Sequence, residues 1–422
     1  MLNTSSKTLG PALLLSIIFI SLPNLLFAQI TIDAEVRPRA EYRNGYQLVR
    51  TADTEPAFFT SQRTRLGFGY EAEPYEIYVS GQDVRVWGES EQLQDNSNVN
   101  IHEAWAKVHL SEKMGIKLGR QELVYDDQRL LGSVNWTQQA RSHDALLVRF
   151  KNAGSDFQFD LGGAYNQESE NVFGNTYALN NYKVLSYMWM NKQVGDIDAS
   201  VLFLTDGFEL QSGGTNFRYT YGTDLNYNKE KWQLNGTVYL QSGDDATRQK
   251  ISAYMMAING AYQVGSLQVK AGYDYLSGGS VDDDNPARNT FNTLYATNHK
   301  FYGHMDYFLN IPANTKGGGL QDLHFGAAYS VSEKTNIALT YHHLALANSI
   351  TNPSNNTETL DTPLGSEFDF SLSYDMSDEV AFKVGYSALV ASSSLDKLQF
   401  RNGKKSQHWG WAMLIISPQI IR

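Results

Sequence analysis

The stretch from Ile30 to Tyr42, ITIDAEVRPRAEY, alternates in chemical character with a period of two residues. Its even positions are apolar or aromatic: Ile30, Ile32, Ala34, Val36, Pro38, Ala40 and Tyr42. Its odd positions are polar and mostly charged: Thr31, Asp33, Glu35, Arg37, Arg39 and Glu41. Because successive side chains of a β-strand point to opposite faces, the pattern predicts a strand with one apolar and one charged face.

The same alternation recurs along the chain, for example in the segments that begin near Phe157, Phe217, Trp232, Phe368 and Val380. Each segment has about ten residues, which is the length that a tilted strand needs to cross the hydrocarbon layer of a membrane. The 25 Tyr and 20 Phe residues suit β structure as well. A soluble β-sandwich also alternates, so a second feature must separate the two architectures.

The connections between these segments supply that feature. Short charged turns alternate with longer connections rich in Gly and Asn; the short turns lie at Glu71, Ser111, Asn152, Val194, Asn228, Ser332 and Asp375. Short periplasmic turns and long extracellular loops are typical of outer-membrane barrels. The sequence therefore predicts an all-β fold, a single transmembrane antiparallel β-barrel of about 18 strands. This count treats residues 278–319 as one long loop at the mouth or in the lumen, although two extra strands there would also keep the number even.

The first residues predict a signal peptide over residues 1–28, which leaves residues 29–422 for the barrel. Lys7 precedes the apolar run from Ala12 to Ile20, and the small residue Ala28 follows at the expected cleavage site. A membrane anchor is the alternative interpretation. The chain has no cysteine, which excludes a thiolate nucleophile and a disulfide framework. We expect a protein of the outer membrane of a Gram-negative bacterium.

Arginine is concentrated in the first third of the mature chain. An arginine that faces lipid at mid-depth costs roughly 2 to 4 kcal/mol, so these side chains are expected to face the lumen. The predicted pore-lining and solute-binding residues are Arg37, Arg39, Arg63, Arg65, Arg85, Arg120, Arg129, Arg141 and Arg149. The guanidinium groups could bind the carboxylates of an anionic solute, or they could pair across strands with acids such as Glu35. We expect both.

Several other functions are disfavoured. The net charge of −11 argues against a nucleic-acid partner. His143 and Asp144 are candidates for a barrel enzyme, and His342 and His343 for a metal, but neighbours on a strand point apart. We therefore expect no catalysis, no metal site and no cofactor.

Two aromatic pairs have the character of girdle residues at the membrane interfaces. They are Tyr187 with Trp189, and Trp409 with Trp411. Such residues ring the outer surface of membrane barrels, so we expect both pairs to face outward.

Ordered motifs are spread over nearly the whole mature chain. They are HEAWAKVHL at His102, GRQEL at Gly119, DDQRLLG at Asp126, NW at Asn135, RSHDAL at Arg141, NHKFYGHMDYF at Asn298, GLQDL at Gly319, YHHL at Tyr341 and LGSEFDFSLSY at Leu364. Together they make the sequence similar to the alginate export family of outer-membrane barrels. The resemblance implies an eighteen-stranded barrel with an electropositive pore for a uronate polysaccharide. Arg120, Arg129 and Arg141 are the positions that carry over most directly.

We therefore expect an outer-membrane channel that passes an anionic, uronate-type polysaccharide or its oligosaccharides through an arginine-lined pore. Its partners would be outer-membrane lipid, the saccharide and, for an exporter, periplasmic export proteins. The alternative is a general or nutrient-uptake porin for small anions and oligosaccharides. The sequence does not choose between export and uptake.

Overall fold

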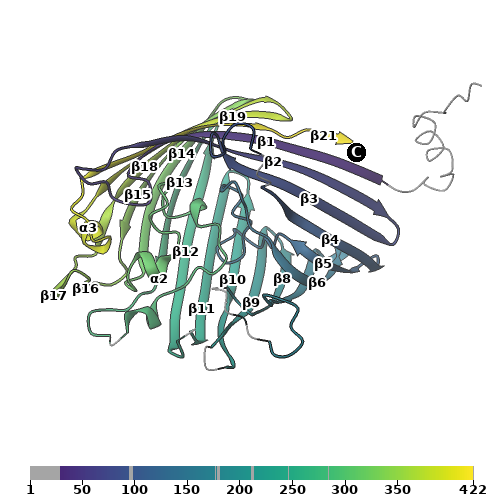
Figure 1. Cartoon of the computed structure of the whole chain (residues 1–422), viewed down its shortest axis with the longest axis horizontal. Helices are drawn as coiled ribbons and strands as arrows, with labels where there is room; N and C mark the ends of the chain where they lie inside the picture. The colour runs from purple at the N-terminus through teal and green to yellow at the C-terminus, as the bar shows by residue number, and fades with distance from the viewer. Residues whose placement is uncertain are drawn as a thin grey trace, which may run out of the picture.

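The computed structural model describes residues 29–421, apart from 95–97, 176, 178–180, 211–212, 246 and 284. The predicted signal peptide, residues 1–28, lies outside the described residues, as does Arg422. Most of the described chain is β-strand (Figure 1). Among the described residues, no helix is both long enough and apolar enough to cross a membrane.

Eighteen antiparallel strands form a closed barrel, because β1 pairs with β2 on one side and with β20 on the other (Figure 1). They are β1 (Gln29–Asn44), β2 (Ala57–Ala72), β3 (Tyr75–Val86), β4 (Val99–Ser111), β5 (Met114–Gln121), β6 (His143–Asn152), β7 (Phe157–Tyr165), β8 (Val184–Val194), β9 (Ile197–Glu209), β10 (Thr215–Lys229), β11 (Trp232–Asp244), β12 (Lys250–Val264), β13 (Leu267–Leu276), β14 (Leu320–Ser332), β15 (Thr335–Ala345), β18 (Pro363–Ser377), β19 (Val380–Ala391) and β20 (Ser406–Ile416). The predicted barrel and its strand number are confirmed.

A short extra strand, β21 (Gln419–Ile421), follows β20 and also pairs with β1. The Pro418 carbonyl accepts a hydrogen bond from the backbone N–H of Ala34 (3.1 Å), so the proline does not stop the pairing.

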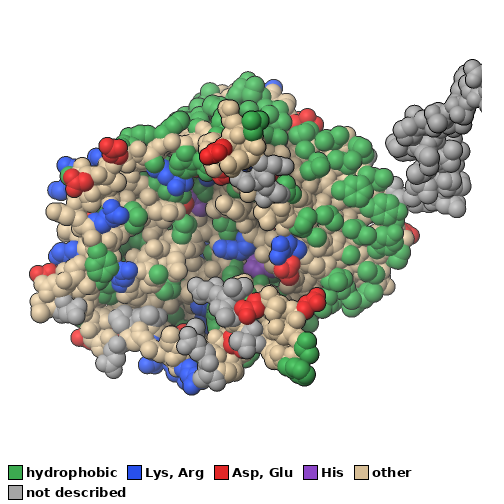
Figure 2. Space-filling view, in the orientation of Figure 1, with side chains coloured by type: hydrophobic (Ala, Val, Ile, Leu, Met, Phe, Trp, Pro, Cys, Tyr) green, Lys and Arg blue, Asp and Glu red, His purple; other side chains and the backbone are tan. Residues whose placement is uncertain are grey.

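The alternation seen in the sequence separates an outer from an inner surface. On β1 the even residue Val36 is 37% exposed, whereas Arg37 and Arg39 are buried. On β2 the same division places Leu66 outside and Arg63 inside. Apolar side chains accordingly gather on the outside of the first strands (Figure 2). A closed sheet also satisfies all ladder hydrogen bonds internally, which the hydrocarbon layer requires.

The connections differ at the two ends of the barrel. Tight turns such as the one between β4 and β5 lie at the end that carries the termini, and longer connections lie at the other end. The connection between β15 and β18 contains the small hairpin of β16 (Thr351–Asn352) and β17 (Asn355–Thr359). The one between β19 and β20 contains α3 (Ser393–Leu398).

Two of the long connections pair with each other. The β5–β6 loop spans residues 122–142, and the β13–β14 loop spans residues 277–319 and contains the short helical turn α2 (Ile311–Asn314). The Gly132 N–H donates to the Tyr295 carbonyl (2.9 Å), and the Tyr295 N–H donates to the Leu130 carbonyl (2.9 Å). We call this pair the inner loops, because both contact the lumen-facing side chains of the barrel.

The aromatic pairs expected at the membrane interfaces face inward instead. Trp409 and Tyr187 are 0% and 1% exposed, and Trp411 is buried as well. Trp136 of the β5–β6 loop packs against Trp409 and Trp411 at ring-centroid distances of 5.6 and 4.9 Å. The girdle prediction was wrong because these residues share the inward phase of their strands. There they form an apolar surface against which the inner loops pack.

Candidate functional site

Three arginines of the first two strands hold the β5–β6 loop inside the barrel. Arg37 donates to the Asn135 carbonyl (2.9 Å), and Arg39 donates to the Trp136 carbonyl (2.7 Å). Arg63 donates to the side-chain amide oxygen of Asn135 (2.8 Å). Irregular backbone leaves carbonyl groups without ladder partners, and a guanidinium group can donate five hydrogen bonds to such acceptors. These arginines therefore determine where the loop crosses the lumen.

The charges on this wall are partly neutralised. Arg63 forms an ion pair with Glu35 (2.6 Å), and Arg39 forms one with Glu41 (2.9 Å). Within the described part of the chain, Arg65 has no carboxylate oxygen within 4.0 Å and is only half-buried. Among Arg37, Arg39, Arg63 and Arg65, it is therefore Arg65 whose charge is available to a solute.

Arg129 anchors the tip of the same loop to the opposite wall. It donates to both carboxylate oxygens of Asp274 (2.8 and 3.0 Å) and pairs with Asp127 (2.7 Å). Burial lowers the pKa of Arg129, but the two carboxylates outweigh it and raise the pKa well above the ordinary value. The Arg141 side chain donates to the Ala296 carbonyl (3.2 Å), and burial lowers its pKa.

Asp126, in the same loop, makes a further contact with the barrel wall, at strands β8 and β11. Its carboxylate accepts hydrogen bonds from the Trp189 indole (2.9 Å) and the Tyr239 hydroxyl (3.1 Å). Burial raises the pKa of this loop carboxyl to about 6, although the hydrogen bonds to it act in the opposite direction. The β5–β6 loop is therefore attached to the barrel by polar contacts of Asp126 and Arg129 and by those of Asn135 and Trp136.

Two of the predicted pore arginines do not face the lumen. Arg120 shares the outward face of β5 with Leu118, which is 49% exposed, and it pairs with Asp144 on the same side (3.0 Å). Arg85 forms an ion pair with Asp83 on the outward face of β3. Both lie near strand ends on the long-loop side, where a lipid-facing charge costs only about 0 to 1 kcal/mol. The expectation treated every arginine as lying at mid-depth, and it does not hold for these two.

Arg149 does face the lumen. It forms an ion pair with Asp160 of the neighbouring strand (2.6 Å), and its side chain remains 44% exposed. A solute can therefore reach this guanidinium group, although its charge is balanced.

Three lysines that the sequence analysis missed also face the lumen. Lys117, Lys270 and Lys383 are each the fourth residue of their strand counted from a short turn, so they lie at similar depth. Across the described residues, none of them has a carboxylate oxygen within 4.0 Å. We call them the lysine ring. Alternation could have identified them, because each lies between apolar neighbours: Ile116 and Leu118, Val269 and Ala271, Phe382 and Val384.

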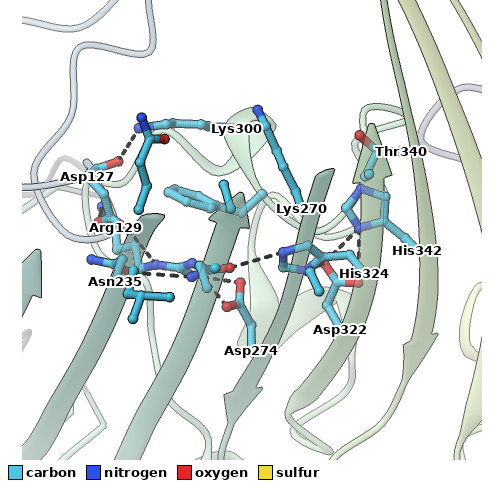
Figure 3. A pocket seen from close by; sticks show the side chains of 18 of the residues that line it. Asp127, Arg129, Asn235, Lys270, Asp274, Lys300, Asp322, His324, Thr340 and His342 are labelled. Carbon is cyan, nitrogen blue, oxygen red and sulfur yellow. Dashed lines mark hydrogen bonds and ion pairs between the residues drawn. The ribbon is translucent and has the colours of Figure 1, made fainter. Parts of the chain in front are cut away.

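Two adjoining cavities lie beside the inner loops, with volumes of about 430 and 580 Å³; of the lysine ring, Lys270 lines the first and Lys383 the second. Both cavities are lined by Lys300 and His304. Lys270 and Lys300 extend into the first one (Figure 3). Its other lining groups include the carboxamides of Asn226, Asn228, Gln233, Asn235 and Asn259. The second cavity contains Lys383 with Trp136 and Trp411. These volumes fall in the range of about 300 to 1,000 Å³ that is usual for small-molecule sites.

The histidine and aspartate that could have formed an enzyme site point to opposite sides of the wall. His143 is buried inside, where its Nδ1 lies 2.8 Å from the Tyr182 hydroxyl. Asp144 lies outside and pairs with Arg120. The two side chains therefore cannot act on one substrate.

A closed 18-stranded barrel with an apolar exterior and a polar lumen defines a channel of the bacterial outer membrane. A family model described as alginate export matches residues 28–406. The chain belongs to the alginate export family, and it is an outer-membrane channel, not an enzyme. A comparison with curated proteins finds no match.

Solved structures of outer-membrane proteins share the fold at low sequence identity. Acinetobacter baumannii OccAB4 aligns with a TM-score of 0.63 and 10% identity, over 94% of this chain and 100% of that one. Pseudomonas aeruginosa OpdK with vanillate aligns with a TM-score of 0.58 and 11% identity, over 92% and 98% of the two chains. Pseudomonas aeruginosa OpdO aligns with a TM-score of 0.61 and 11% identity, over 93% and 98%. At this identity the likeness concerns the fold alone.

The outward position of Arg120 leads to a direct prediction. Replacing Arg120 with Ala should leave ion selectivity unchanged, because its charge lies outside the lumen. The matched change of Arg149 to Ala should lower anion preference, because it leaves the Asp160 carboxylate uncompensated beside the lumen. Reversal potentials in a salt gradient across a planar bilayer measure both effects. Equal shifts in the two variants would contradict the assigned faces.

Proposed function

We propose that this channel passes an anionic polysaccharide of the uronate type, or its oligosaccharides, along the cationic lumen. The observation that carries the proposal is that several lumen cations, among them Arg65 and the lysine ring, have no carboxylate oxygen within 4.0 Å among the described residues. An unpaired cation attracts a passing carboxylate, while the surrounding water keeps the contact weak enough to release it. The carboxamides of the first cavity offer hydrogen bonds to sugar hydroxyl groups.

The predicted arginines then divide into two roles in this proposal. Arg65 and Arg149 contact the solute directly, because their side chains are accessible. Arg37, Arg39, Arg63, Arg129 and Arg141 shape the path by holding the inner loops. In this proposal the path runs beside the β5–β6 loop, where Trp136, Lys300 and Lys383 provide apolar and cationic surfaces.

The comparisons support the proposal at the level of chemistry. The family is described as alginate export, and alginate is a uronate polymer. A solved channel of this fold is described with vanillate, which is also a carboxylate. The lysine ring lies at the short-turn end, which is the periplasmic end of such barrels. A polymer that is delivered by periplasmic partners and leaves the cell would meet this ring first.

Channel block by oligosaccharides of defined length tests the proposal. Uronate oligomers added on the short-turn side should interrupt the ion current, and the half-blocking concentration should fall about two- to fivefold per added sugar, since an exposed ion pair contributes about 0.5 to 1 kcal/mol. Neutral oligomers of equal length serve as the control. A general porin for small anions, the alternative interpretation, would show no such dependence on length. Equal block by charged and neutral oligomers would refute the proposal.

A further inference from the structure

Three potential metal ligands converge on the wall of the first cavity (Figure 3). Asp322 and His324 lie on the inward face of β14, and His342 faces them from β15, where it pairs directly with His324. The nearest Asp322 oxygen lies 2.8 Å from Nδ1 of His342 and 3.5 Å from Nδ1 of His324. The three ligand atoms all lie within 4.8 Å of one another.

The other ring nitrogens face acceptors. Nε2 of His324 lies 3.0 Å from the amide oxygen of Asn259, and Nε2 of His342 lies 3.6 Å from Asp369. Metal-bound histidines in proteins commonly donate their second N–H to such a group, which leaves the first nitrogen free as a ligand. With its proton on Nε2, His324 directs the lone pair of Nδ1 at the Asp322 carboxylate, and this buried nitrogen has no hydrogen-bond partner. A cation between the two groups would make that arrangement favourable.

The surrounding charges point the same way. Asp322 is 1% exposed, and the buried acids Asp274, Glu367 and Asp369 lie on the adjoining strands. Arg129 balances Asp274, but the described chain offers no arginine or lysine within 4.0 Å of Asp322 or Asp369. A divalent cation would offset the charge of Asp322 and Asp369, whose ion-pair partners within 4.0 Å in the described chain are His304, His324 and His342.

We propose that Asp322, His324 and His342 bind a divalent transition-metal ion of the Zn²⁺ type, with one coordination position open to the cavity. Two ligand atoms about 2.0 to 2.1 Å from one tetrahedral ion lie about 3.3 Å apart, which matches the separations between Asp322 and the two histidines after small shifts. Imidazole and carboxylate ligands suit Zn²⁺. Binding displaces the proton that Nδ1 of His342 shares with Asp322, and this proton leaves to water.

The open position gives the site a role in transport, and this consequence rests on the proposed function. The cavity that contains the site also contains Lys270 and Lys300. A bound dication adds positive charge to the same cavity and offers a coordination position to a uronate carboxylate. Zinc should therefore retain an anionic oligomer in the lumen for longer than the lysines alone.

Equilibrium dialysis of the purified full-length channel against ZnCl₂ in detergent tests the site without reference to transport. We expect one tightly bound zinc per chain. Changing His324 to Ala, His342 to Ala or Asp322 to Asn should remove it, and changing Asn259 to Ala should weaken it about tenfold. The matched control is His343→Ala, because His343 is the sequence neighbour of His342 on the outward face.

The results separate the two proposals. Absence of stoichiometric zinc in the wild-type channel would overturn the metal site, as would equal zinc binding by His324→Ala and His343→Ala. Block by uronate oligomers is then measured with and without zinc; we expect zinc to lower the half-blocking concentration in the wild type and not in His342→Ala. Zinc bound without this change would retain the site and refute its role in uronate retention. Block by uronates without any zinc binding would leave the proposed function standing alone.

Discussion

Exchanging Lys117, Lys270 and Lys383 together for glutamate is expected to turn the anion preference that we propose for the channel into a cation preference. The exchange changes the charge of the ring by six units, and no carboxylate within 4.0 Å in the described structure offsets the lysines that are lost. A unit charge at about 5 Å contributes on the order of 1 to 3 kcal/mol in a wet protein environment. The ratio of anion to cation permeability should therefore fall by more than about tenfold, as measured by reversal potentials in a KCl gradient.

The control keeps the same charge change at the same end of the barrel but outside the lumen. Lys113, Lys231 and Lys334 lie exposed on short turns, so their exchange for glutamate leaves the wall of the path intact. Charges in open solvent are screened over a distance of about 8 Å at physiological salt. We expect only a small shift in this variant. If both triple variants shifted selectivity equally, the ring would have no special role and general surface charge would explain the preference.

The architecture was predictable because a two-residue period survives in almost every strand. The alternation in Ile30 to Tyr42 correctly separated Val36 from Arg37 and Arg39, and the short turns correctly ordered the hairpins. The same rule, applied consistently, would also have turned Arg120 outward and placed Lys270 inside. A concentration of arginine carries no information about strand phase, so residue type alone could not show which face each arginine occupies.

The inner loops could not be predicted in the same way. Their position depends on contacts between residues far apart in sequence, such as Arg129 with Asp274 or Arg37 with Asn135. No local pattern encodes such a pairing. The candidate metal ligands show the same difficulty, because His324 and His342 come together only through the register of two strands. The neighbouring pair His342 and His343 is conspicuous in the sequence, but its two side chains face opposite sides of the wall, and His342 instead lies opposite His324.

Replacing Arg129 with Ala is expected to release the β5–β6 loop from the wall and to enlarge the channel. Arg129 is 3% exposed and contacts both oxygens of Asp274, which is itself 1% exposed. Removing one partner of a buried ion pair costs about 3 to 5 kcal/mol, because the remaining charge stays buried without compensation. That is enough to displace a loop without unfolding a barrel of 18 paired strands. Single-channel recordings should show a larger, noisier open conductance, and limited proteolysis should cut within residues 122–142.

The double variant Arg129→Ala with Asp274→Ala separates two effects. One is the loss of the attraction that Arg129 provides, and the other is the cost of leaving the Asp274 carboxylate buried without a partner. If the penalty comes mainly from the uncompensated Asp274 carboxylate, removing that carboxylate as well should restore much of the quiet conductance and the protease resistance. The Asp127 pair and the cation–π contact of Arg129 with Phe301 (4.1 Å) are lost in both variants, so they cannot account for a difference between them. A double variant as noisy as the single one would show that the guanidinium holds the loop through its other contacts. Wild-type conductance in Arg129→Ala would instead show that this loop does not limit the path at all.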